Sequence, residues 1–111
     1  MTLGPVVDRQ RWATLTIFEQ MGNISSEVGR SFNAKRRQDP DAREQAMIRA
    51  LDLFDATVAS LLGSNSNRVR EVLRAKEQYL QILLNENEPP EAEASIEKYF
   101  AQFAIAARLN R

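Results

Sequence analysis

The sequence predicts an all-α fold, an antiparallel up-down-up-down four-helix bundle with a short N-terminal arm. Four stretches carry apolar residues at alternating three- and four-residue spacing, which places these residues on one side of a helix. The clearest stretch is the second, with apolar residues at Met47, Leu51, Phe54, Val58 and Leu61. Because only a few residues connect the stretches, neighbouring helices should run antiparallel. We expect residues 1–15 to form the arm and residues 16–111 to form the bundle, as a single domain.

The arm is expected to be extended, because Gly4-Pro5-Val6-Val7 combines a proline with β-branched residues. Two residues compete as the start of the first helix. Asp8 can act as an N-cap, and Thr16 fits a capping box in which the Glu19 side chain reaches back to the Thr16 amide. We prefer Thr16, because a first helix that ends near Arg37 is then about as long as the other three.

The boundaries of the later helices follow from prolines, glycine and capping residues. Asp39-Pro40-Asp41 is a strong start for the second helix, since its first aspartate can cap and its proline suits the first helical position. Gly63 ends that helix. The third helix runs to about Asn85, and three residues can cap its start: Ser64, Ser66 and Asn67. Pro89-Pro90 breaks it, and the fourth helix runs from there nearly to Arg111.

The apolar stripes of the other three helices complete the predicted core. The first helix contributes Phe18, Met21, Ser25, Val28 and Phe32. The third helix contributes Val69, Val72, Leu73, Tyr79, Leu80 and Leu83. The fourth helix contributes Ile96, Phe100, Phe103 and Ala107. Aromatic residues and methionines at this spacing are typical of core packing rather than of a cofactor site.

The middle of the first helix carries small residues along one edge of its stripe: Gly22, Ser25, Ser26 and Gly29. A glycine inside a helix costs about 1 kcal/mol relative to alanine, so close packing should compensate for it. We therefore expect another backbone to pass close to this edge. An intramolecular helix crossing is the preferred explanation, and a contact between subunits or a hinge is the alternative.

Lys76 falls in the middle of the apolar stripe of the third helix, while Asp55 lies on the flank of the second helix's stripe. Antiparallel register through the turn at Gly63 places Asp55 opposite about Arg74, so Asp55 can meet either Lys76 or Arg74. We predict a buried ion pair that fixes the register of the two helices. The alternative is that Lys76 lays its aliphatic part on the core and extends its ammonium group into water.

No catalytic or cofactor motif occurs in the sequence. The absence of cysteine and histidine excludes disulfides, thiolate sites, the usual zinc ligands, the Glu-x-x-His motif of helical di-iron sites and the commonest general base. Neither a phosphate-binding loop nor a glycine-rich dinucleotide fingerprint is present. Glu19, Asn23 and Glu27 share one side of the first helix, but that side projects opposite the stripe and is better explained as a solvated face than as a metal site. We expect no cofactor, no metal site and no enzymatic activity.

The charge balance and the N-terminal segment restrict the possible partners and compartments. Fifteen basic and fifteen acidic side chains cancel, which gives no reason to expect general attraction to polyanions. Met1–Val7 lacks a basic segment followed by a long apolar run, and no stretch approaches the roughly 18 to 20 apolar residues that span a bilayer. The absence of cysteine also favours a reducing compartment. We therefore expect a cytoplasmic protein with no membrane partner.

The bundle should collect arginines at one end: Arg9, Arg11, Arg68, Arg70, Arg108 and Arg111. At the other end Lys35, Arg36 and Arg37 meet a larger acidic set: Asp39, Asp41, Glu86, Glu88, Glu91 and Glu93. Arg68 and Arg70, in the first turn of the third helix, oppose its dipole, so local helix energetics do not explain them. The basic end could bind an anion or nucleic-acid phosphates, or it could pair with the acidic end of another subunit. Scattered solubilising arginines are the alternative.

Apolar residues outside the core stripes suggest self-association. Leu53 with Ala46 and Ala50 on the second helix, and Ile105 with Leu109 on the fourth, project away from the stripes and would face water in a monomer. Such surfaces are typical of subunit contacts. We expect a homo-oligomer that uses Leu53, Ile105 and Leu109.

Three segments, Phe18–Arg30, Arg49–Leu53 and Ala106–Arg111, resemble a group of small, uncharacterised bacterial and archaeal helical proteins. In general architecture the chain is also similar to the four-helix-bundle proteins of ribosomal RNA intervening sequences, relatives of the accessory protein of diversity-generating retroelements. The resemblance implies a ring-like homo-oligomer that binds nucleic acid or another protein without catalysis. The chain departs from that pattern in lacking overall positive charge. The polar residues to test on the matching segments are Glu19, Asn23, Glu27, Arg30 and Arg108.

Together these observations favour a noncatalytic, self-associating helical adaptor with a possible protein partner. A nucleic-acid-binding accessory protein that uses the basic end is the alternative. A carboxylate metalloenzyme ranks third.

Overall fold

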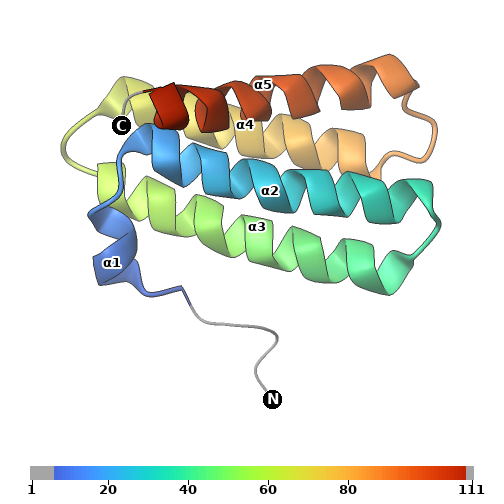
Figure 1. Ribbon diagram of the computed structural model, residues 1–111, viewed down its shortest axis with the longest axis horizontal. Coiled ribbons are helices and arrows are strands. Elements are labelled where there is room, and N and C mark those ends of the chain that lie inside the picture. The colour runs from blue at the N-terminus through green and yellow to red at the C-terminus, as the bar shows by residue number, and fades with distance from the viewer. Residues whose placement is uncertain (1–6, 110–111) are drawn as a thin grey trace.

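The computed structural model describes residues 7–109 of the chain. These residues form five helices: α1 (Arg9–Ala13), α2 (Ile17–Arg36), α3 (Pro40–Leu61), α4 (Ser66–Leu84) and α5 (Pro90–Leu109). Helices α2 to α5 run antiparallel and form a bundle, while α1 packs against α3 at one end (Figure 1). The predicted all-α bundle is therefore confirmed. The first part of the predicted arm, residues 1–6, and Arg111 lie outside the described residues.

The two candidate starts of the first helix are the caps of two different helices. Asp8 caps α1, and its carboxylate accepts a hydrogen bond from the Arg11 amide at 3.2 Å. Thr16 caps α2 in the predicted capping box, in which the Thr16 and Glu19 side chains accept each other's backbone amides at 3.1 and 2.9 Å. The prediction of an extended arm is wrong for residues 9–13, because burial of Trp12 holds this short segment in a helix against α3.

The other helix boundaries agree with the sequence except at the start of α4. Asp39 caps α3 and Pro40 is its first residue, as predicted. Gly63 follows α3 with a left-handed φ of 84°. The cap of α4 is Asn65, whose side chain accepts the Arg68 amide at 3.0 Å. Ser64, Ser66 and Asn67 were therefore the wrong candidates, since an asparagine one residue before the helix satisfies the free amide equally well.

The core lies between all four long helices and is rich in aromatic residues. Tyr79 at its centre contacts Phe32, Phe54 and Phe100, with ring centroids 5.8 to 6.4 Å apart. The predicted stripes of α2 and α5 are buried at Met21, Val28, Phe32, Ile96, Phe100 and Phe103. The core prediction is wrong for Leu73, which is 45% exposed.

Helix α2 lies close to both α3 and α5, whereas α4 stands further from its neighbours. On α3, Ala46 and Ala50 are 1% and 0% exposed, so the prediction that they face water is wrong. Their small side chains allow α2 and α3 to approach, and the expected stripe of α3 is consequently rotated towards α4. Of that stripe Phe54 is fully buried, while Met47, Leu51, Val58 and Leu61 are only partly buried.

The small residues of α2 meet a neighbouring backbone at one position. A Cβ atom on Gly22 would lie 3.1 Å from the Cα of Ala104 in α5, so the predicted intramolecular crossing is confirmed there. A Cβ atom on Gly29 would meet nothing within 4 Å. Close packing therefore explains Gly22 and leaves Gly29 without a packing role among the described residues.

Candidate functional site

Large apolar side chains remain accessible where α3 and α4 meet. Leu73 and Leu84 of α4 are 45% and 55% exposed, and Leu62, just after α3, is 66% exposed. Helical spacing aligns Leu73 and Leu84 with partly buried Leu80 on α4, beside partly buried apolar residues of α3. We call this surface the α3–α4 edge and define it by eight residues: Ile48, Leu51, Asp55, Val58, Leu73, Lys76, Leu80 and Leu84.

An ion pair lies in the middle of the α3–α4 edge. The Nζ atom of Lys76 is 3.4 Å from the carboxylate of Asp55. The side chains are 29% and 59% exposed, so the expectation that the pair is buried is wrong, and Lys76 also extends its ammonium group to the surface as the alternative held. Arg74 forms no ion pair with any residue between positions 7 and 109. Coulomb energy between such exposed charges is strongly screened by water, and the pair adds little stability.

The position of the ion pair shows which apolar residues of α3 and α4 lie at the same height along the bundle axis. Because α3 and α4 are antiparallel, the Asp55–Lys76 contact places Val58 level with Leu73. On the other side of the pair it places Leu51 level with Leu80. The edge thus has an apolar, charged, apolar order on both helices.

The sequence predicted four of these residues, Leu51, Val58, Leu73 and Leu80, as core. Val58 and Leu80 are partly buried and do pack against the core, whereas Leu51 is only partly buried and Leu73 is 45% exposed. The true core positions on α3 include Ala46 and Ala50 instead. The apolar stripes are therefore wider than the internal core requires, and their excess faces outward at the α3–α4 edge.

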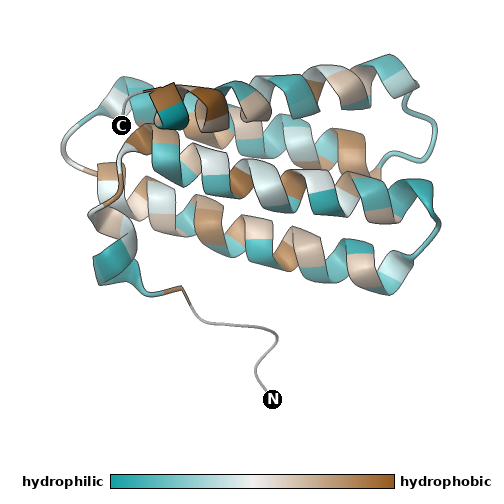
Figure 2. Ribbon diagram, viewed as in Figure 1, coloured by the Kyte–Doolittle hydropathy of each residue, from teal (hydrophilic) through white to brown (hydrophobic). Residues whose placement is uncertain are grey.

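The residues predicted to contact another subunit lie on two separate surfaces. Leu53 is partly buried and packs against the core, because α1 and α2 both approach that side of α3; the prediction that it projects into water is wrong. Ile105 and Leu109 of α5 are 49% and 78% exposed, as expected. Figure 2 shows this apolar end of α5 beside the C-terminus.

The segments that carry the predicted basic residues do lie at one end of the bundle, but two of these arginines already form ion pairs. Helix α1, the start of α4 and the end of α5 lie at the same end of the bundle (Figure 1). Arg9 is 3.9 Å from Asp52, and Arg68 is 2.6 Å from Glu71. The other described arginines of this end, all exposed, are Arg11, Arg70 and Arg108. The predicted Arg111 lies outside the described residues.

Glu27 is buried, which the sequence reasoning missed. Its carboxylate lies between Arg30 at 3.0 Å and Arg49 at 2.9 Å, and the residue is only 8% exposed. The prediction of a solvated face is wrong at Glu27, because α3 covers that side of α2. Glu19 instead serves the capping box, and Asn23 donates to the Glu19 carbonyl at 3.0 Å. The sequence feature that could have indicated a buried Glu27 is Arg49, which becomes its partner once α3 packs on α2.

A groove of about 520 Å³ adjoins Glu27 between α1, α2 and α3. Trp12, Asn23 and Arg30 line it together with Leu53. Trp12 is itself held in place, because its indole donates to the Thr57 hydroxyl at 3.0 Å and its carbonyl accepts from Gln20 at 2.9 Å. These two hydrogen bonds of Trp12 hold α1 on the bundle beside the groove.

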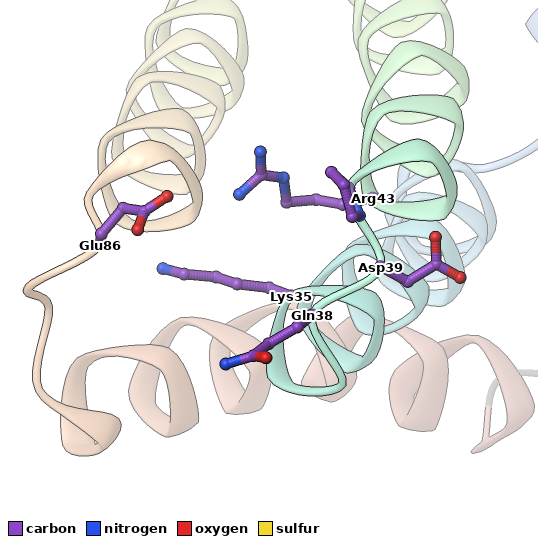
Figure 3. Close-up of a pocket in the computed structure, with 6 residues that line it drawn as sticks. Lys35, Gln38, Asp39, Arg43 and Glu86 are labelled. Atoms are coloured by element: carbon purple, nitrogen blue, oxygen red, sulfur yellow. The ribbon is translucent and has the colours of Figure 1, made fainter.

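A pocket of about 410 Å³ lies at the opposite end of the bundle, between the α2–α3 turn and the end of α4. Figure 3 shows Lys35 and Arg43 extending towards it, with Glu86 on the α4 side. The Lys35 ammonium group donates to the carbonyls of Ile82 and Asn85, both at 2.9 Å, and lies 3.2 Å from Glu93. Lys35 therefore closes the carboxyl end of α4 with two hydrogen bonds, and its charge is balanced by Glu93.

The remaining charged residues of this end form a second network. Arg36 contacts both Glu93, at 3.6 Å, and Glu97. Arg37 lies 3.7 Å from Asp39. Of the six acidic residues predicted here, Asp39 and Glu93 contact these basic residues, and Glu97 joins them from the next turn of α5.

The described part of the chain, residues 7–109, contains no group of three or more acidic side chains arranged to hold a metal ion. None of its helices is long and apolar enough to cross a membrane. No protein-family model matches the chain, and neither a curated protein nor a solved structure shows significant similarity to it. The resemblance to small helical proteins and retroelement accessory proteins therefore stays a prediction.

Proposed function

We propose that this protein is a noncatalytic helical adaptor that associates with itself through the α3–α4 edge. One observation supports the proposal most strongly: exposed leucines of α4 and partly exposed apolar residues of α3 flank the Asp55–Lys76 ion pair. An apolar strip of this kind, framed by charges, is typical of a protein–protein contact. Because the strip lies on two adjacent helices, a second helical bundle can pack along it.

Light scattering coupled to size-exclusion chromatography tests the proposal. The wild-type protein is expected to elute as a dimer. Leu73→Glu places a charge within the edge, so it should yield a monomer that keeps its helical circular dichroism. Ile105→Glu is the matched control, because Ile105 is 49% exposed on α5 against 45% for Leu73 on α4.

The two variants separate the possible surfaces. Loss of the dimer in Leu73→Glu alone supports the α3–α4 edge. Loss in Ile105→Glu alone would assign the contact to α5 and overturn the choice of surface. A wild-type protein that stays monomeric at every concentration would overturn self-association itself.

A nucleic-acid-binding accessory role is the second candidate, and the gathering of arginines at one end of the bundle supports it. Arg9 and Arg68 already face acidic partners, which reduces the charge available for phosphates. If the role holds, DNA or RNA should retain the protein at low salt, and retention should fall with added salt. The double variant Arg68→Glu/Arg70→Glu should abolish it. Retention that ignores both changes would exclude the basic end as the binding site.

A further inference from the structure

We infer that the proposed dimer has its two-fold axis parallel to the helices, so that α3 of each copy faces α4 of the other and Asp55 pairs with Lys76 of the partner subunit. The inference rests on the proposed self-association and adds its geometry and its partner, a second copy of this chain. Its basis is the Asp55–Lys76 contact, which lies between apolar residues of α3 and α4 that are partly or largely exposed.

Two symmetric arrangements keep the helices of the two copies aligned. A two-fold axis perpendicular to the helices that crosses them at the level of the ion pair would stack α3 on α3 and place Asp55 of one copy against Asp55 of the partner subunit. Lys76 would likewise face Lys76. An axis parallel to the helices stacks α3 on α4 of the partner subunit and leaves every residue at its own level. Because Asp55 and Lys76 already share a level, each then faces an opposite charge. Like charges at the centre of an interface are strongly unfavourable, so electrostatics selects the parallel axis.

The same axis also matches the apolar residues. Val58 is level with Leu73 within one chain, so it meets Leu73 of the partner subunit as well. Leu51 meets Leu80 of the partner subunit for the same reason. The exposed face of Leu73, 45% in a single chain, would thus be covered on both copies at once. The edge is therefore self-complementary in charge and in apolar register.

This arrangement assigns the surface ion pair a role in recognition. Within one chain the pair is too exposed to contribute much stability. Between two chains it becomes a ring of four alternating charges in a less hydrated contact, where each charge has two opposite neighbours. A shift of the two copies along the helices would break that ring, so the charges specify the register while the leucines provide the contact area.

Charge reversal tests the inference. Asp55→Lys makes all four central charges positive, and Lys76→Asp makes all four negative. Each variant alone is expected to dimerise at least about tenfold more weakly than the wild type, because like charges then meet. An equimolar mixture of the two variants should restore the dimer, and native mass spectrometry should find it almost entirely heterodimeric. Lys98→Asp, an equal charge change at an exposed site on α5, is the control and should leave dimerisation unchanged.

The outcomes distinguish this inference from the proposed function. A wild-type monomer would overturn self-association and the inference with it. A wild-type dimer that persists equally in both single variants would keep self-association and overturn the Asp55–Lys76 geometry. Dimers that weaken in both variants but show no preference for the heterodimer would place the charges near the interface without opposing each other, which also overturns the geometry. Circular dichroism of each variant should match the wild type, since an exposed pair contributes little to folding.

Discussion

Gly22 and Gly29 lie on the same helix, yet only Gly22 meets another backbone. Gly29→Ala should therefore raise the free energy of unfolding by about 0.5 to 1 kcal/mol, because alanine loses less backbone entropy in a helix and its Cβ enters open space. Gly22→Ala should lower it by about 1 kcal/mol or more, since the new Cβ pushes against Ala104. Urea unfolding of the two variants makes the comparison. Equal effects of the two substitutions would contradict the assigned α2–α5 crossing.

The buried hydroxyl of Tyr79 should make the stability of the folded protein depend on pH at alkaline pH. Burial raises the pKa of its hydroxyl from 10.0 to about 12, and that hydroxyl donates to Ser31 at 2.8 Å. Between these two pKa values the unfolded chain has lost the proton and the folded chain keeps it, so stability falls as pH rises from about 10 to about 12. The loss should approach about 2.7 kcal/mol, since one pKa unit corresponds to about 1.4 kcal/mol.

The variant Tyr79→Phe separates this contribution from that of other groups. At neutral pH it should cost about 1 kcal/mol for the lost hydrogen bond. Above pH 10 its stability should fall less steeply than that of the wild type, as measured by denaturant unfolding at a series of pH values. Parallel pH profiles for the two proteins would show that Tyr79 does not titrate as described.

At the scale of single residues, the local capping signals could be predicted from the sequence and the long-range partners could not. Thr16 and Glu19 lie within one turn, so their capping box follows from spacing alone. Glu27 depends on Arg49, which only the packing of α3 on α2 brings within 2.9 Å. Trp12 likewise depends on Thr57. No pattern within α1 or α2 contains that information.

At the scale of helices, Lys35 of α2 stabilises the carboxyl end of α4. Lys35→Met keeps the aliphatic length but removes the donors to Ile82 and Asn85, so unfolding free energy should fall by about 1.5 to 3 kcal/mol. Amide hydrogen exchange should accelerate in the last turn of α4. Arg37→Met is the control: Arg37 is 60% exposed and should change stability by less than about 0.5 kcal/mol. Comparable losses in the two variants would refute a specific role for Lys35.

The helix boundaries could largely be predicted from the sequence, whereas the side of each helix that is buried could not. Prolines, the glycine at residue 63 and the capping residues mark the ends of α2, α3 and α5 by local chemistry. Which face of a helix is buried depends on the helices that pack against it. The amphipathic stripe of α3 predicted Leu51 as core, but Ala46 and Ala50 take the fully buried positions and Leu51 is only partly buried. From the sequence alone, an apolar stripe that serves both the core and an outer surface cannot be distinguished from one that serves the core only.

For the whole molecule, self-association has a thermal consequence. Binding of a second copy stabilises the folded state by mass action, so the Tm of the wild type should rise with protein concentration. Leu73→Glu should remove that dependence and leave the Tm at its dilute value. Differential scanning calorimetry over a wide concentration range measures both. A Tm that is independent of concentration in the wild type would argue against a dimer of any geometry.

The central claim is that a second copy covers the α3–α4 edge, and solvent exposure of single methyl groups tests it most directly. Relaxation of leucine and isoleucine methyl signals by a soluble paramagnetic agent can be recorded at low and at high protein concentration. At high concentration Leu73 and Leu84 should become protected, while Ile105 and Leu109, exposed on α5, should stay accessible. Protection of Ile105 and Leu109 with Leu73 still accessible would contradict the account.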